Sequence, residues 1–187
     1  AYEGTSSPTK TVFVEYVGMM PYINGIKDLW ISPTGDLIAG QALIETNGWA
    51  RNARGFYQRD DHELSLDIQA HEGFIEMRWI AEVVVEQLRA AGVMATMRSV
   101  AGSTWSDNKA FGNFEAVIDW NACGSVNEPW VSMNRYTQQF LRPIDQRSPG
   151  NNNFVRWSGV GAEAYSQLVA QIGAVSYTHL TLPTILL

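Results

Sequence analysis

Cysteine is almost absent from the sequence, because Cys123 is the only one among 187 residues. A single thiol excludes an internal disulfide and any zinc site built from several cysteines. It says nothing about the cellular compartment, since many large exported proteins also lack disulfides.

Basic residues and long apolar runs are also scarce. The chain has 13 Lys and Arg against 19 Asp and Glu, a formal net charge of -6, and no basic run. It therefore lacks the electrostatic footprint that non-specific binding to nucleic acid or to an anionic membrane needs. A membrane-spanning helix needs about 18 or more apolar residues, and the most apolar segment, residues 74–88, is interrupted by Glu76, Arg78, Glu82 and Glu86.

Several motifs of catalysis and nucleotide binding are missing too. The sequence has no Gly-x-Ser-x-Gly elbow, no phosphate-binding Gly-x-x-x-x-Gly-Lys-Ser/Thr loop and no strand-borne Gly-x-Gly-x-x-Gly,. Cys123 has no obvious His partner, and His62 and His71 lie at opposite ends of one predicted strand, which makes a poor metal site,. We expect no cofactor, no metal and no enzymatic activity.

What is present is an alternation of strands and helices. Apolar residues alternate with polar ones over residues 64–70, which predicts a strand with one buried face,. Apolar residues at intervals of three and four over 77–91 predict a helix that ends at Gly92. A strand over 93–100, a helix capped by Ser103 or Thr104 and ended by Gly112, and a strand over 114–120 follow. We expect an α/β fold with a mixed or parallel sheet covered by helices.

Elements outside this core are also predicted. Residues 36–47 are expected to form an amphipathic helix ended by Gly48, and residues 7–22 a loop-rich, extended segment,. Residues 130–141 and 162–172 are expected to be helices, separated by a long surface loop over 142–153,.

Both ends of the chain are unusual. The sequence opens at Ala1 without a Met or a signal segment, which indicates a mature product or a fragment,. Residues 175–187 follow the expected helix end at Gly173 and resemble the translation of a transposon-type sequencing adapter. We therefore expect a domain over residues 1–174 and a non-native tail over 175–187, which would remove His179 from any site. The alternative is an apolar C-terminal strand.

The loop after the strand ending at Trp120 is the first candidate site, because ligand loops gather at the carboxyl ends of parallel strands. Small residues there let a ligand approach the backbone, and indole faces offer flat apolar area for stacking. The candidate ligand-binding residues are Trp120, Asn121, Ala122, Cys123, Gly124, Ser125, Asn127 and Glu128. The alternative is that Trp120 and Trp130 are core aromatics and that Asn127 satisfies the loop backbone.

A catalytic interpretation of this loop is a third possibility. Asn127-Glu128-Pro129 resembles the acid/base motif of a large clan of retaining glycosidases. Those enzymes need a barrel of about 250 residues and a second carboxylate about 5 Å away. The chain is too short and shows no strand-end Glu nucleophile after residue 128.

Taken in order, the segments resemble a family 5 extracytoplasmic solute-binding protein of ABC importers, the oligopeptide-binding type. The resemblance covers residues 1–174. Its pieces are Ala1-Tyr2-Glu3-Gly4-Thr5, a Pro-containing stretch to Pro21-Tyr22, Asn47-Gly48-Trp49, the strand over 64–68, Ala81-Glu82, Gln87-Leu88, Ala91-Gly92-Val93, Thr104-Trp105, Gly112-Asn113-Phe114-Glu115, Asn127-Glu128-Pro129 and Asn152-Asn153-Phe154-Val155-Arg156-Trp157-Ser158-Gly159.

This resemblance implies most of the second large lobe of a two-lobe, type II periplasmic-binding-protein-like fold, with the first lobe, the signal sequence and the C-terminal return missing. It implies a periplasmic or extracytoplasmic receptor that delivers an oligopeptide or similar solute to the membrane subunits of an ABC permease. Peptide-binding members hold the peptide amino terminus with an Asp, where this chain has Ser125, and the loop is about two residues longer here. An oligosaccharide is therefore the alternative ligand, because indole rings can stack on sugar rings. Of the tryptophans, Trp79 and Trp105 are expected to pack on helices and not to contact the ligand.

Overall fold

A computed structural model describes residues 20–26, 36–120 and 130–181 of the chain. These residues form two compact units. The first unit contains residues 36–108 and 114–120, and the second contains residues 20–26, 109–113 and 130–181. The boundary between them falls inside one helix, α4 (Gly102–Phe111).

A three-stranded parallel sheet is the centre of the first unit. Its strands are β4 (Ser65–His71), β5 (Met94–Val100) and β6 (Ala116–Val117), in the spatial order β5-β4-β6. The register pairs Ser65 with Met94 and Ile68 with Ala116. The predicted parallel sheet is thus confirmed, although the strand expected over 114–120 has only two residues in the ladder.

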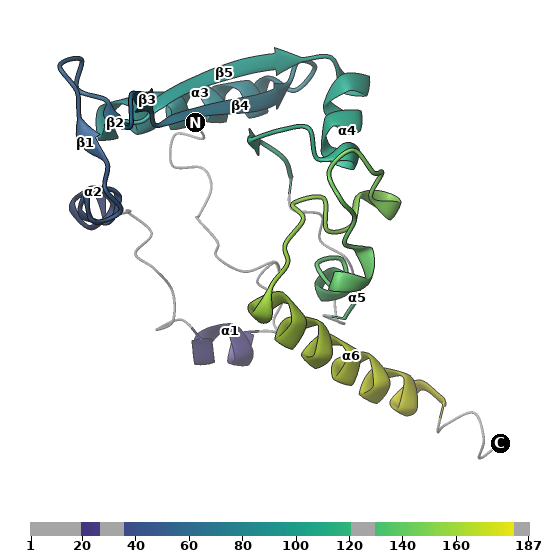
Figure 1. Ribbon diagram of the computed structural model, residues 1–187. Helices are drawn as coiled ribbons and strands as arrows, with labels where there is room; N and C mark the ends of the chain where they lie inside the picture. Colours follow the sequence, from purple (N-terminus) through teal and green to yellow (C-terminus); the bar gives the residue numbers. More distant parts are fainter. Residues whose placement is uncertain (1–19, 27–35, 121–129, 182–187) are drawn as a thin grey trace. The chain divides into compact units, whose positions relative to one another are not determined.

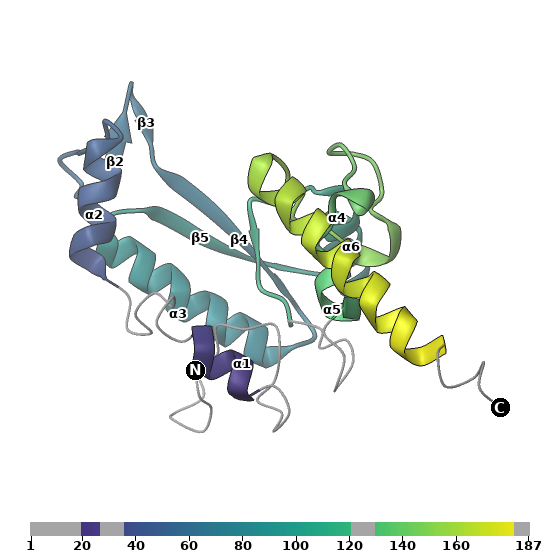
Figure 2. The ribbon, with the colours of Figure 1, turned by 90° about the horizontal axis from the view of Figure 1, so that it is seen from below.

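Helix α3 (Ile75–Ala91) connects β4 to β5 and lies along one face of these two strands, as Figures 1 and 2 show. It ends at Gly92, whose φ of 100° is the left-handed conformation that glycine adopts without strain,. Arg89 lies in the last turn, where a cation complements the helix dipole,. The helix predicted from the three- and four-residue spacing is therefore confirmed.

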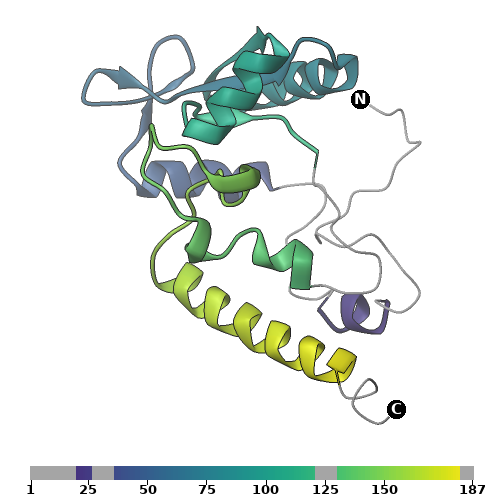
Figure 3. The same cartoon turned by 90° about the vertical axis from the view of Figure 1, so that its right-hand side faces the viewer.

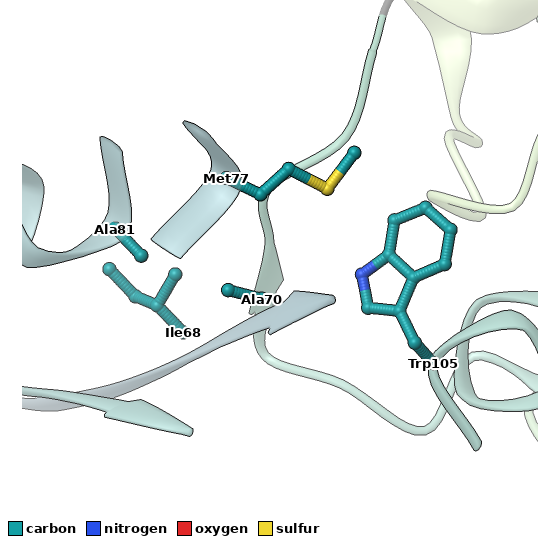
Figure 4. Packing of buried hydrophobic residues seen from close by; sticks show 5 residues of the cluster. All are labelled: Ile68, Ala70, Met77, Ala81 and Trp105. Atoms are coloured by element: carbon teal, nitrogen blue, oxygen red, sulfur yellow. The ribbon is translucent and has the colours of Figure 1, made fainter. Parts of the chain in front are cut away.

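The core of this unit lies between α3 and β4. Figure 4 shows Ile68 and Ala70 of β4 facing Met77 and Ala81 of α3, with the indole of Trp105 from α4 at the end of the cluster. All five side chains are buried. Burying a side chain the size of Met77 contributes about 1.5–3 kcal/mol to stability, so this contact fixes the helix on the sheet.

The face of β4 that was predicted to be polar is also partly buried. Gln69 is 1% exposed, and its Oε1 accepts a hydrogen bond of 2.8 Å from Asn108 Nδ2 on α4. Helix α4 begins at Gly102, so the predicted caps Ser103 and Thr104 are wrong: both lie inside the helix. Gly112 follows the helix with a φ of 80°, as predicted.

A small antiparallel sheet precedes β4 and is formed by β1 (Ala50–Arg51), β2 (Tyr57–Arg59) and β3 (His62–Glu63). Before it, α2 (Leu37–Thr46) begins at Asp36, whose side chain accepts a 2.9 Å hydrogen bond from Ala39 N. This helix was predicted to be amphipathic, but none of its residues is buried.

The second unit consists of helices and turns. Its elements are α1 (Met20–Ile26), α5 (Trp130–Asn134), the short 3-10 helices η2 (Gln138–Phe140) and η3 (Pro149–Asn151), and α6 (Val160–Thr181). Figure 3 shows α5 beside α6, and η2 also packs on α6. The extended segment predicted over 7–22 is wrong at residues 20–22, which begin α1; the rest of that segment lies outside the described residues.

Two predicted helix boundaries in this unit are also wrong. The helix predicted over 130–141 breaks after Asn134, because the Thr137 hydroxyl donates to the Asn134 carbonyl at 2.7 Å and Gln138 N donates to Ser166 Oγ at 2.9 Å. The helix predicted over 162–172 continues through Gly173 to Thr181. A Cβ at Gly173 would clash with the Trp130 indole, so glycine serves close helix packing there and not helix termination,.

The long loop over 142–153 is ordered by a buried asparagine and a partly buried arginine. Asn153 is 1% exposed and its side chain hydrogen-bonds both the N–H and the carbonyl of Trp157. The Arg156 guanidinium donates to the carbonyls of Ala110 and Gln146 at 2.8 and 2.9 Å. Burial lowers the pKa of Arg156 below its ordinary value.

Candidate functional site

The candidate site lies at the carboxyl ends of the parallel strands in the first unit. His71 is the last residue of β4, and the chain leaving β6 reaches Trp120 three residues after that strand ends. Glu72 N donates to the Val100 carbonyl at 2.9 Å, which joins the ends of β4 and β5. Ligand sites of open parallel sheets form at this edge, so the structure places Trp120 where the sequence predicts a site.

Four aromatic rings lie in succession at this edge, each in contact with the next, and we call them the aromatic row: Trp105, His71, Phe74 and Trp120. The His71 ring lies 5.3 Å from Trp105 and 4.3 Å from Phe74 between centroids. The Phe74 and Trp120 rings are 4.3 Å apart at an interplanar angle of 69°, an edge-to-face contact. Such pairs are preferred because the positive edge of one ring meets the negative face of the other.

Exposure changes along the aromatic row. Trp105 is 6% exposed and belongs to the core, whereas Trp120 is 53% exposed. The alternative that Trp120 is a core aromatic is therefore wrong, and the expectation that Trp105 serves packing is confirmed. Trp79 on α3 was also expected to pack, but it is 50% exposed.

Two hydrogen bonds hold the main chain at and just before Trp120. Trp120 N donates a 2.8 Å hydrogen bond to Asp119 Oδ1, and Ile118 N donates to the Gln69 carbonyl at 2.9 Å, extending the pairing of β6 with β4. An exposed indole on a fixed backbone offers flat apolar area to a sugar ring or an aromatic side chain.

The remaining predicted site residues, Asn121, Ala122, Cys123, Gly124, Ser125, Asn127 and Glu128, lie outside the described residues. Sequence reasoning missed His71 and Phe74. The signal was their position at the end of β4 and shortly after it, because segments that follow parallel strands meet at one edge of the sheet.

A cavity also lies in the second unit. It has a volume of about 440 Å³ and lies among α5, η2 and α6, with Trp130, Thr137, Ser166 and Gly173 in its walls. The hydroxyls of Thr137 and Ser166 already donate to backbone carbonyls within the unit. The cavity is therefore mainly an apolar space between packed helices.

The described ranges offer neither a metal site nor a membrane span. No group of three or more His, Cys, Asp or Glu side chains comes together there in a way that could hold a metal ion. Among those same residues, no helix combines the length and the apolar character needed to cross a bilayer.

Comparison with known proteins gives matches only among solved structures, because neither the family models nor the curated proteins match. One match is a periplasmic oligopeptide-binding protein of an oligopeptide ABC transporter from Thermotoga maritima, with mannohexaose bound. Its TM-score is 0.72 at 16% identity, covering 93% of this chain and 35% of that chain. A second is NikA from Brucella suis in complex with Fe(III)-EDTA, with a TM-score of 0.64 at 20% identity, covering 92% of this chain and 31% of that chain.

A third match is the periplasmic binding protein MelB from Agrobacterium fabrum in complex with stachyose. Its TM-score is 0.55 at 14% identity, covering 73% of this chain and 21% of that chain. The chain thus spans about one third of the length of the first two structures. These likenesses confirm the fold that the resemblance implied: the chain has the α/β fold of part of an ABC-transporter substrate-binding protein of the oligopeptide-binding type.

Proposed function

We propose that this chain is part of the substrate-binding component of an ABC importer. It captures an oligopeptide or a similar small solute in a cleft between two lobes and delivers it to the membrane subunits of the permease, on the periplasmic or extracytoplasmic side. The observation that carries the proposal is the fold, which matches an oligopeptide-binding protein over 93% of this chain. The domain over residues 1–174 supplies the lobe, and residues 175–187 are a non-native tail.

The proposed mechanism is binding without catalysis. A two-lobe receptor changes shape because the ligand has a higher affinity for the closed state than for the open one, which shifts the population toward closure. Trp120 contributes one wall of the cleft, together with the loop residues that follow it. No bond in the solute is made or broken, so the chain needs no catalytic group.

An oligosaccharide is the second candidate ligand. The 53% exposed indole of Trp120 at the carboxyl edge of the sheet favours it, because a flat apolar face stacks on a sugar ring,. The matching structures with bound mannohexaose and stachyose support the same class. A peptide with an aromatic side chain would use the same face.

The proposal is tested by calorimetric titration of the full-length product of the gene with mannohexaose, stachyose and a tripeptide. We expect saturable binding of at least one of these probes and unchanged probe after incubation. Turnover of an aryl glycoside that is abolished by Glu128→Gln would show a hydrolase instead and would overturn the proposal.

A further inference from the structure

We propose that Phe74 is a positioning residue that fixes the indole of Trp120 for ligand contact. The inference rests on the proposed function for the role of Trp120, and it adds a residue from a different part of the sequence. Phe74 contacts Trp120 directly, with ring centroids 4.3 Å apart and an interplanar angle of 69°.

Phe74 is itself held by the backbone at the start of α3. It occupies the N-cap position with an extended φ of -114°, and its N–H donates to the His71 carbonyl at 3.3 Å. Its own carbonyl accepts from Met77 N at 3.2 Å, so the residue is tied on both sides. Its ring is half-buried and packs against the core cluster of this unit.

His71 also contacts the Phe74 ring, with centroids 4.3 Å apart, and its own ring is held in turn. Its Nδ1 accepts a 2.9 Å hydrogen bond from Gly73 N. Gly102 leaves space for the imidazole, because a Cβ there would lie 2.5 Å from His71 Nε2. The ring that supports Phe74 is thus fixed by a hydrogen bond, by a close backbone approach and by the edge contact with Trp105.

The aromatic row therefore links a buried ring to an exposed one through two partly buried rings. A side chain that is already immobilised loses less entropy on binding than a free one. Removing the ring of Phe74 while keeping apolar bulk should leave Trp120 exposed but free to rotate. The expected cost is a loss of ligand affinity of about two- to thirteenfold, the range that one immobilised side chain carries.

The test is fluorine NMR of the full-length gene product labelled with fluorotryptophan. The Trp120 line is assigned with Trp120→Phe, and the Trp79 line, from a tryptophan of similar exposure on α3, serves as the internal control. In Phe74→Leu we expect the Trp120 line to shift and to narrow, while the Trp79 line stays in place. Phe74→Tyr, which keeps the ring, should restore the position of the Trp120 line. Should Phe74→Leu fail to fold, Phe74→Met replaces it.

An unchanged Trp120 line in the folded Leu or Met variant would overturn the positioning role. A shift of the Trp79 and Trp120 lines together would also overturn it, because that result shows general loosening. The same samples are titrated with mannohexaose and with a tripeptide. A full-length parent protein whose Trp120 line responds to neither probe counts against the proposed function, whereas the comparison of parent and variant lines still decides the role of Phe74.

Discussion

Replacement of Asn153 by alanine should be among the most damaging single changes in the second unit. The side chain accepts a 2.9 Å hydrogen bond from Trp157 N, and its amide donates to the carbonyls of Trp157 and Thr137 at 3.1 and 3.4 Å. Asn153 also has a φ of 44°, in the left-handed region. Two good hydrogen bonds at about 1 kcal/mol each, together with about 1 kcal/mol for alanine in this conformation, give a loss of about 3 kcal/mol.

The matched control at this position is Asn153→Gly. Glycine loses the same hydrogen bonds but adopts the positive φ without strain, so its loss should be about 1 kcal/mol smaller than that of alanine. Equilibrium urea unfolding gives the stabilities, and hydrogen exchange at the Trp157 amide reports the local effect. A loss below about 1 kcal/mol for alanine, or a glycine variant less stable than the alanine variant, would refute the reasoning.

Two further predictions concern α6. Burial raises the pKa of Tyr165 to about 12, so its contribution to stability is present below the unfolded pKa of about 10 and is lost as the pH rises from about 10 to about 12. In urea unfolding at alkaline pH, Tyr165→Phe should reduce that loss of stability. An equal slope of stability against pH in parent and variant would contradict the prediction. At Gly173 a Cβ would clash with the Trp130 indole, so Gly173→Ala should lower the free energy of unfolding in urea by about 1–3 kcal/mol. The control is Gly161→Ala, because only Trp157 Cζ2, at 3.9 Å, lies near a Cβ at that position. Equal losses of stability in the two variants would show that the Trp130 contact is not the cause.

The strand and helix pattern of the first unit could be predicted because local signals and tertiary packing agree there. The period-two alternation over 64–70 corresponds to β4, and the helical spacing that ends at Gly92 corresponds to α3. The burial of Gln69 could not be predicted, because its partner Asn108 comes from a helix 39 residues later. Sequence periodicity describes which residues share a face, and it does not show what covers that face.

The errors in the second unit have a common physical origin. The break after Asn134 depends on Gln138 N bonding to Ser166 Oγ on α6, a contact between residues 28 positions apart. The continuation of α6 through Gly173 depends on the Trp130 ring that packs there. Both are tertiary effects that override helix propensity, so a window of neighbouring residues carries no trace of them.

Only part of the candidate site could be predicted from the sequence, because the rest depends on tertiary structure. Trp120 follows a strand in sequence and could be identified from that position alone. Phe74 lies 46 residues earlier, and only the strand order β5-β4-β6 brings the segment after β4 beside the segment after β6. The contact between the two rings is therefore a property of the topology.

The affinity ratio between Trp120→Ala and the control Trp79→Ala in the full-length gene product tests the central claim most directly. Both indoles are about half exposed in the same unit, so the two changes remove similar exposed surface. Calorimetry gives the two affinities, with whichever of mannohexaose, stachyose and the tripeptide binds the parent protein most tightly as the probe. We expect Trp120→Ala to weaken binding by about 1–3 kcal/mol and Trp79→Ala to leave it unchanged. Equal affinities for both variants, with lower stability for Trp120→Ala, would contradict a ligand-contact role for Trp120.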